Sequence, residues 1–285
     1  MIKSILLPLA EGPLSTTAKD YAFWLAKKEG SQIHALAVMD IKAFEIPVLG
    51  TPDGFMPSVV SPPLDESQSL LDELAATAKA ALDRFAQECE SRKIPCSTEI
   101  KTGIPADLIS RTALAHDIIV MARTGHSRIA TNQDRLEALI SQVIRSSVRP
   151  VLIAGSRIGE GADIHSIVVA YDGSVHAGRA LLVAAELGSR PGVNCTLVTV
   201  STSEDLGEET IEAPHAFLCH HGVVPHKRVI VSTKPSEVIC SLVAETKADI
   251  LIMGAYGHGP VREMLFGSNT EKVLAHCSTS VILQS

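Results

Sequence analysis

The glycines of one loop are the residues of this chain best suited to chemistry. The stretch 253–273 joins an apolar run, typical of a buried strand, to a pattern typical of a helix. Its key glycines are Gly254, Gly257 and Gly267. Glycine permits positive φ and removes the Cβ that would block a ligand. Consecutive N–H groups can then face one anion, and the next helix adds a positive dipole end, so the spacing predicts a phosphate-binding loop.

A ligand-free interpretation of these residues is also open. Ser268 and Glu271 have the spacing of a capping box, which stabilises a helix start without any ligand. Gly254 and Gly257 would then serve only a tight turn. Asp172 presents the same choice. In the ligand-binding interpretation its carboxylate accepts a hydrogen bond from a ribose hydroxyl or helps to hold a Mg²⁺ ion that bridges phosphates. In the ligand-free interpretation it accepts a hydrogen bond from the backbone that follows it, in an Asp turn.

Composition limits the class of protein. The 285 residues are 46% apolar and 20% charged, which favours a globular fold over disorder. The net charge of −7 and the absence of a Lys/Arg block argue against nucleic-acid binding. No run is long enough to span a membrane, and the opening apolar stretch reads as a strand rather than a signal peptide. Six scattered cysteines without a C-x-x-C pair indicate free thiols and a cytoplasmic protein.

The chain contains two copies of one unit. The segment ILLP at 5–8 matches IVVA at 167–170, HDIIVMARTGH at 116–126 matches ADILIMGAYGH at 248–258, and VIRSSVRPVLIA at 143–154 matches VLAHCSTSVILQ at 273–284. The period is too long for a solenoid, so the repeat predicts two tandem domains. We expect a first domain over 1–155, a linker over 156–164 and a second domain over 165–285.

Strands and helices alternate within each copy, which predicts an α/β fold with two tandem, doubly wound, five-stranded parallel sheets of Rossmann-like type. Pro105 and Pro235 suit first helical positions. Predicted strands cover 3–9, 32–39, 97–101, 117–121, 151–154, 166–170, 194–200, 226–231, 249–253 and 280–283. Predicted helices cover 15–28, 66–91, 105–115, 135–145, 175–187, 208–220 (shortened), 235–246 and 269–276.

The G-A-Y-G…G-S spacing resembles the ATP-binding signature of the universal stress protein family, and the similarity extends over both copies, as in tandem members of that family. The resemblance implies that Asp172 lies near the nucleotide and that Val200 contacts adenine through its backbone. It also makes Asp172 the candidate for a Mg²⁺ ion held through the nucleotide. The implied set of nucleotide contacts is Ala170, Asp172, Val200, Met253, Gly254, Gly257, His258, Gly267, Ser268, Asn269 and Thr270.

The first copy departs from this signature. Ala122 and Arg123 stand at the first glycine, Glu137 and Ala138 stand at the Gly-Ser position, and the first strand lacks the Asp. A glutamate would repel phosphate, so we expect no ATP in this half. Arg123 and Arg128 would be solvated or, less commonly, would pair with an anion.

Two further features carry open alternatives. The cluster Cys219, His220, His221 and His226 could bind zinc, or it could be an ordinary helix end with histidines near its dipole. The insert 41–64 is rich in Pro and Gly; it is either a surface loop packed on its own domain or a lid or partner-binding arm.

The resemblance implies an ATP-binding regulatory module with slow hydrolysis at most, which couples the nucleotide to assembly or to an unknown protein partner. Members of the family commonly pair through their last strands, so 150–153 and 280–283 could meet inside one chain as a pseudo-dimer, or in a homodimer. One alternative is a nucleotide hydrolase or adenylyl-transfer enzyme, for which His258 and Asp172 are the only candidate groups. The other is an interaction protein with a vestigial loop.

Overall fold

Strands and helices alternate along the described chain, as the sequence predicts. The computed structural model describes residues 2–9, 14–40, 64–123, 130–155, 158, 163–257 and 268–285. The first half contains β1 (Ser4–Leu9), α1 (Leu14–Glu29), β2 (Gln32–Asp40), α2 (Leu64–Ser91), β3 (Cys96–Gly103), α3 (Pro105–Ala113), β4 (Ile118–Ala122), α4 (Ala130–Ser146) and β5 (Val151–Ala154). The second contains β6 (Ser166–Ala170), α5 (Val175–Gly188), β7 (Asn194–Ser201), α6 (Glu204–His220), β8 (His226–Val231), α7 (Pro235–Thr246), β9 (Ile250–Gly254), α8 (Ser268–His276) and β10 (Ser280–Gln284).

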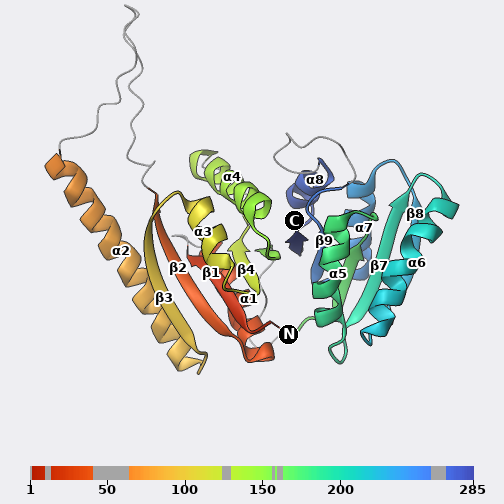
Figure 1. The fold of residues 1–285 in the computed structure, drawn as a ribbon, viewed down its shortest axis with the longest axis horizontal. Coiled ribbons are helices and arrows are strands. Elements are labelled where there is room, and N and C mark those ends of the chain that lie inside the picture. Colours follow the sequence, from red (N-terminus) through yellow and green to blue (C-terminus); the bar gives the residue numbers. More distant parts are fainter. Residues whose placement is uncertain are drawn as a thin grey trace, which may run out of the picture.

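The two halves share one sheet. Its strand order is β3-β2-β1-β4-β5-β10-β9-β6-β7-β8, and the strands are parallel within each half. The last strands of the halves, β5 and β10, pair antiparallel, with Ile282 opposite Leu152. The predicted pairing of last strands is therefore confirmed within one chain. It covers an edge that each half would otherwise expose to aggregation. Figure 1 shows α2 and α6 at opposite ends of the molecule, beside the edge strands β3 and β8.

Helix α6 begins earlier than predicted. The sequence analysis placed its start at 208, but the helix runs from Glu204 and is capped by Ser203, whose side chain accepts from the Leu206 N–H at 3.4 Å. The apolar pattern that marks the rest of the helix is weak here, and Gly207 reads as a breaker. In the fold Gly207 lies so close to Val229 that a Cβ would overlap it, so the glycine lets the helix approach the sheet.

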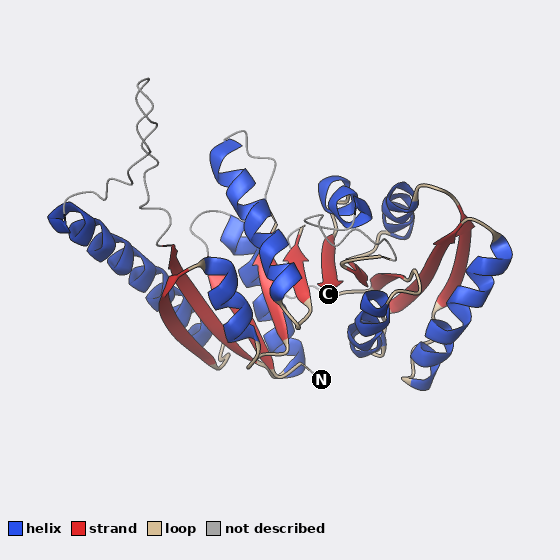
Figure 2. Ribbon diagram, turned by 45° about the horizontal axis from the view of Figure 1, so that its top comes forward, coloured by secondary structure: helices blue, strands red, loops and turns tan. Residues whose placement is uncertain are grey.

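Helices cover both faces of the continuous sheet (Figure 2). One apolar cluster joins α1 and α2 of the first half to α5 and α6 of the second, and the other joins α3 and α4 to α7 and α8. Nearly all residues of the inner strands β4, β5, β9 and β10 are buried, whereas the edge strands β3 and β8 contain no buried residue. Continuous apolar strands of this kind are the signature of parallel sheets covered on both faces.

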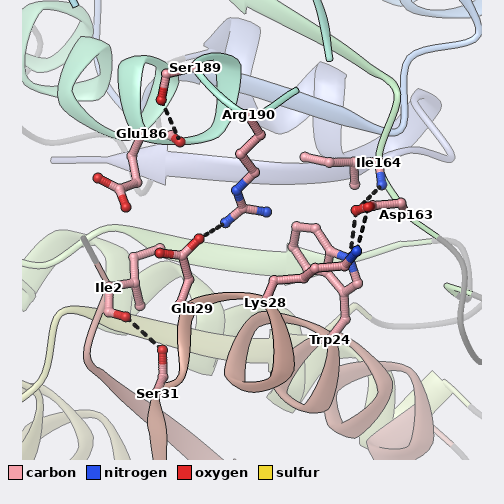
Figure 3. A network of polar contacts seen from close by, with 10 residues as sticks. All are labelled: Ile2, Trp24, Lys28, Glu29, Ser31, Asp163, Ile164, Glu186, Ser189 and Arg190. Carbon is pink, nitrogen blue, oxygen red and sulfur yellow. Dashed lines mark hydrogen bonds and ion pairs between the residues drawn. The ribbon is translucent and has the colours of Figure 1, made fainter. Parts of the chain in front are cut away.

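Side chains also join the halves beside the N-terminal end of β1 (Figure 3). The Arg190 guanidinium lies 4.9 Å from the centroid of the Trp24 ring and 2.5 Å from Glu29 Oε1. Asp163 accepts from Trp24 Nε1 at 3.3 Å and pairs with Lys28 at 2.5 Å. The hydrogen bond from Lys28 lowers the pKa of Asp163. Asp163, which the sequence analysis placed in the linker, thus anchors the second half to α1.

Several predictions concern residues outside the described ranges. These are residues 41–63 of the predicted insert and the linker residues 156–157 and 159–162. Leu64, the last residue of the predicted insert, begins α2. Within the described part of the chain, no helix combines the length and hydropathy needed to cross a membrane.

Candidate functional site

Three parallel strands of the second half end side by side. Ala170, the last residue of β6, pairs with Met253 on β9 and with Val198 on β7, and Val200 follows two positions later. Helix α5 packs on one face of the sheet and α8 on the other, so the chain leaves β6 and β9 in opposite directions. Open α/β sheets bind ligands at such a switch in strand order. Ala170, Met253 and Val200 therefore lie together at this edge.

Asp172 opens the turn between β6 and α5. Its Oδ1 accepts from the Ser174 N–H at 3.0 Å, and Gly173 between them has φ 81°. Ser174 then caps α5 by accepting from the Ala177 N–H at 3.1 Å. The Asp turn considered from the sequence is thus present, and it holds an exposed carboxylate at the crevice. Asp172 can serve both the turn and a ligand, because the turn hydrogen bond is made by Oδ1 and the oxygen that faces Gly257 is Oδ2.

Gly257 brings the glycine loop against that carboxylate. A Cβ at Gly257 would lie 2.9 Å from Asp172 Oδ2. Two residues 85 positions apart in the sequence are therefore neighbours at the end of the sheet. The side-chain-free surface of Gly257 leaves room beside a carboxylate, where any larger residue would intrude.

Gly254 has a different reason to be glycine. A Cβ there would lie 2.6 Å from Ala177 N and 2.9 Å from the carbonyl carbon of His176, in the first turn of α5. The prediction of positive φ was wrong for both Gly254 and Gly257, since neither has a left-handed φ. Gly254 permits close packing of β9 against α5, and the residue with positive φ at this site is Gly173.

The start of the glycine loop is bonded to the protein itself. The Ala255 N–H donates to the Gln284 carbonyl at 2.8 Å, and Gly254 still belongs to the β9–β10 ladder. The Thr270 hydroxyl, which was expected to face a ligand, is buried and donates to the Ala255 carbonyl at 2.8 Å. Thr270 therefore has a structural role that fixes α8 to the loop. Backbone N–H groups that could bind an anion therefore begin no earlier in this loop than Tyr256.

Helix α8 begins at Ser268, one residue before its predicted start. Ser268 is exposed and Asn269 is half-buried in the first turn, where free N–H groups and the helix dipole favour an anion. A capping box would place Ser268 before the helix rather than within it. His258 and Gly267 lie outside the described residues.

Tyr256 is a site residue that the sequence analysis missed. Its carbonyl accepts from Ser174 Oγ at 3.3 Å, and its ring meets the His176 ring edge-on, with centroids 5.4 Å apart. Burial raises the pKa of Tyr256, and the nearby Arg145 of α4 opposes this rise. The loop is thereby packed against both α5 and the first half. The feature of the sequence that could have indicated Tyr256 is an aromatic residue between two glycines of the loop.

The corresponding loop of the first half is built differently. The Arg123 N–H donates to the Ala154 carbonyl at 3.0 Å, as Ala255 does to Gln284. Its guanidinium is half-buried and donates to the carbonyls of Cys277 and Thr279 in the second half, which corrects the expectation of a solvated side chain. Burial lowers the pKa of Arg123.

The other first-half substitutions lie inside a helix. Glu137 and Ala138 align with Gly267 and Ser268 in sequence, but α4 already begins at Ala130. They are exposed on the helix surface and no helix start is present at their position. Gly125, His126 and Arg128 lie outside the described residues.

The proposed zinc cluster is not assembled. Cys219 is exposed and its Sγ lies 3.9 Å from the ring nitrogens of His215, while the His221 ring packs against Phe217 with centroids 4.4 Å apart. Among the described residues no three His, Cys, Asp or Glu side chains are grouped to hold a metal ion. This favours the helix-end interpretation.

Comparison with known proteins is consistent with this fold. The family model described as "Universal stress protein family" matches residues 1–155 and again 163–283. The chain belongs to the universal stress protein family. A curated universal stress protein of Synechocystis sp. is 27% identical over 99% of both chains. One from Thermus aquaticus is 30% identical, covering 41% of this chain and 96% of its own. A solved universal stress protein from Archaeoglobus fulgidus has a TM-score of 0.77 at 21% identity, covering 99% of this chain and 98% of its own.

Proposed function

We propose that the second half of this universal stress protein binds ATP and that the protein is a cytoplasmic regulatory module, with slow hydrolysis at most. The observation that carries the proposal is the placement of Gly257 against Asp172 at the strand-order switch, where a Cβ would lie 2.9 Å from the carboxylate. Ala170, Met253 and Val200 would border the adenine and ribose. The loop from Gly257 onward and the first turn of α8 would hold the phosphates.

The residues also suit a Mg²⁺ ion carried by the nucleotide. Mg²⁺ prefers oxygen ligands and is commonly held by one or two carboxylates together with substrate phosphates. Asp172 offers an exposed carboxylate fixed by the Ser174 N–H, so it would orient the ion without a rearrangement of the turn. Bound Mg²⁺ would neutralise phosphate charge beside this carboxylate. ATP bound here would alter the interface between the two halves at its α8 end. In this way it would influence assembly or the binding of a partner.

Calorimetric titration of the full chain with ATP and Mg²⁺ tests the proposal, with thermal denaturation as a second readout. Binding raises the melting temperature with ligand concentration by mass action. We expect Gly257→Val to abolish binding without loss of the fold, because a branched side chain would fill phosphate space. Glu137→Gln, an exposed change in the first half, is the matched control and should bind like the wild type.

Three outcomes separate the candidate functions. A heat of binding with slow phosphate release supports the regulatory module. Rapid phosphate release would instead favour a hydrolase. No binding of ATP, ADP or AMP by the wild-type chain would refute the proposal and favour an interaction protein with a vestigial loop.

A further inference from the structure

The C-terminal end of α8 is hydrogen-bonded by a residue of the other half. Arg123, which directly follows β4, donates from guanidinium Nη1 to the Cys277 carbonyl and, at 3.4 Å, to the Thr279 carbonyl. Because β5 and β10 pair antiparallel, the carboxyl edge of the first half meets the connection between α8 and β10. Cys277 directly follows α8, so the cation also faces the negative end of the helix dipole.

Helix α8 is short and is packed against the protein by few side chains. Of its nine residues, Thr270 and Val273 are buried, and the helix packs on α7. The Thr270 hydroxyl ties the first turn to the Ala255 carbonyl at 2.8 Å. A helix of this length depends on tertiary contacts rather than on its own stability. The hydrogen bonds at its two ends, from Thr270 and from Arg123, therefore contribute strongly to where its first turn lies.

The internal repeat shows that this arginine is not a requirement of the fold. Ala255 occupies the equivalent position of the second half, and both backbone N–H groups donate to a carbonyl at the end of the neighbouring strand. The Ala255 side chain is buried and cannot reach across the interface. The end of α4 is bonded differently: the Ser147 carbonyl accepts from the Ser285 hydroxyl at 2.5 Å. Arg123 is thus a feature of the half that lacks the glycine signature.

We propose that Arg123 of the first half is a positioning residue for the nucleotide site of the second half. By fixing the C-terminal end of α8, it holds the first turn, with Ser268 and Asn269, where that turn meets the phosphates. This inference rests on the proposed binding of ATP. Without the anchor α8 would spend part of its time displaced, and the apparent affinity would fall in proportion to the binding-competent fraction. The adenosine moiety borders the strand ends instead, so the loss should depend on the phosphates.

Hydrogen exchange of the full chain without nucleotide tests the anchor itself. We expect the amides of α8 to exchange at least about fivefold faster in Arg123→Gln than in the wild type, with α7 unchanged, because local opening of α8 costs less. Arg149→Gln is the matched control: the Arg149 guanidinium also donates to a helix-end carbonyl, that of Leu114 at 3.1 Å, but within the first half. Its α8 amides should exchange as in the wild type. Unchanged exchange of α8 in Arg123→Gln would overturn the proposal.

Calorimetric titration with ATP and with AMP, each with Mg²⁺, tests the consequence for binding, at a temperature where every variant is folded. Arg123→Gln should weaken ATP binding about fivefold to tenfold and AMP binding less than about twofold. Arg123→Lys, which keeps a charged donor, should recover part of the loss, and Arg149→Gln should bind like the wild type. An ATP affinity that is unchanged in Arg123→Gln, or an equal loss for both nucleotides, would overturn this inference alone. No binding by the wild type would instead refute the proposed function, and the positioning role with it.

Discussion

Replacing Gly254 or Gly257 with alanine should separate the two tasks of the glycine loop. At Gly254 the new Cβ would lie 2.6 Å from the backbone nitrogen of Ala177, which α5 holds in place. At Gly257 it would meet only Asp172 Oδ2 at 2.9 Å, the end of an exposed side chain. The two variants add the same methyl group, so they are matched controls for each other.

The expected magnitudes follow from these contacts. Overpacking against fixed atoms costs about 1–3 kcal/mol, and glycine-to-alanine replacement at a compatible φ returns about 0.4–1 kcal/mol through the unfolded state. Gly254→Ala should therefore destabilise the fold by about 1–2 kcal/mol. In Gly257→Ala the methyl group meets only Oδ2 at the end of the exposed Asp172 side chain, which can shift slightly while Oδ1 keeps its bond to the Ser174 N–H, so stability should change by about 0.5 kcal/mol or less. ATP affinity should fall at least about tenfold, equivalent to about 1.4 kcal/mol, because the methyl group enters phosphate space.

Urea denaturation measures the first effect and calorimetric titration with ATP and Mg²⁺ the second. We expect Gly254→Ala to lose stability and, where folded, to retain ATP binding. Retained stability with lost ATP binding in Gly254→Ala would refute the packing explanation. Equal destabilisation by the two variants would show that Gly257 is also required for packing, and the site assignment would lose its principal support.

Three further changes test other parts of the structure. Thr270→Val should cost about 1–3 kcal/mol in urea denaturation, because the buried Ala255 carbonyl loses its hydroxyl donor; unchanged stability would contradict this role. The hydrogen bond from Lys28 lowers the pKa of Asp163, so the contribution of this pair to folding stability is present above the unfolded pKa of about 4 and is lost as pH falls through the folded value. The difference in unfolding free energy between wild type and Asp163→Asn should therefore narrow below about pH 4. A difference that stays constant with pH would refute the pairing. Burial, and after it the charge of the neighbouring His34, lowers the pKa of His116, so the unfolded chain takes up the proton at a higher pH than the folded chain. Folding stability should therefore fall as pH drops below about 6.5, and it should fall less in His116→Gln. Identical stability–pH profiles for the two proteins would show that His116 does not cause the loss.

The sequence predicted the secondary structure well because the signals are local. Apolar runs marked most of the strands, and the predicted bounds 151–154 and 166–170 agree with β5 and β6. The more polar strand β8 also has its predicted bounds, 226–231. Pro105 and Pro235 marked helix starts through their fixed φ. The start of α6 was missed because Ser203 capping and the close approach of Gly207 to Val229 depend on where the helix packs.

The place of the candidate site was predicted in outline, since the carboxyl ends of parallel strands must share one edge of the sheet. The resemblance to the family named Ala170, Met253 and Val200 as nucleotide contacts, and the strand pairing places these three residues at one edge. The sequence could not tell that Gly254 packs against α5 or that Gly257 faces Asp172, since both contacts join segments about 80 residues apart. Residue type alone gave the two glycines the same role.

The amino-acid sequence by itself determined the internal repeat, the strand–helix alternation and the asymmetry between the two copies of the loop. These depend on residue type and spacing, which the chain carries along its length. Only the tertiary structure decided that the two halves share one sheet, that Arg123 reaches into the second half, and that Thr270 is bonded to the protein. The physical reason is that each of these depends on which distant atom lies within hydrogen-bonding or van der Waals distance, and spacing along the chain does not fix that distance.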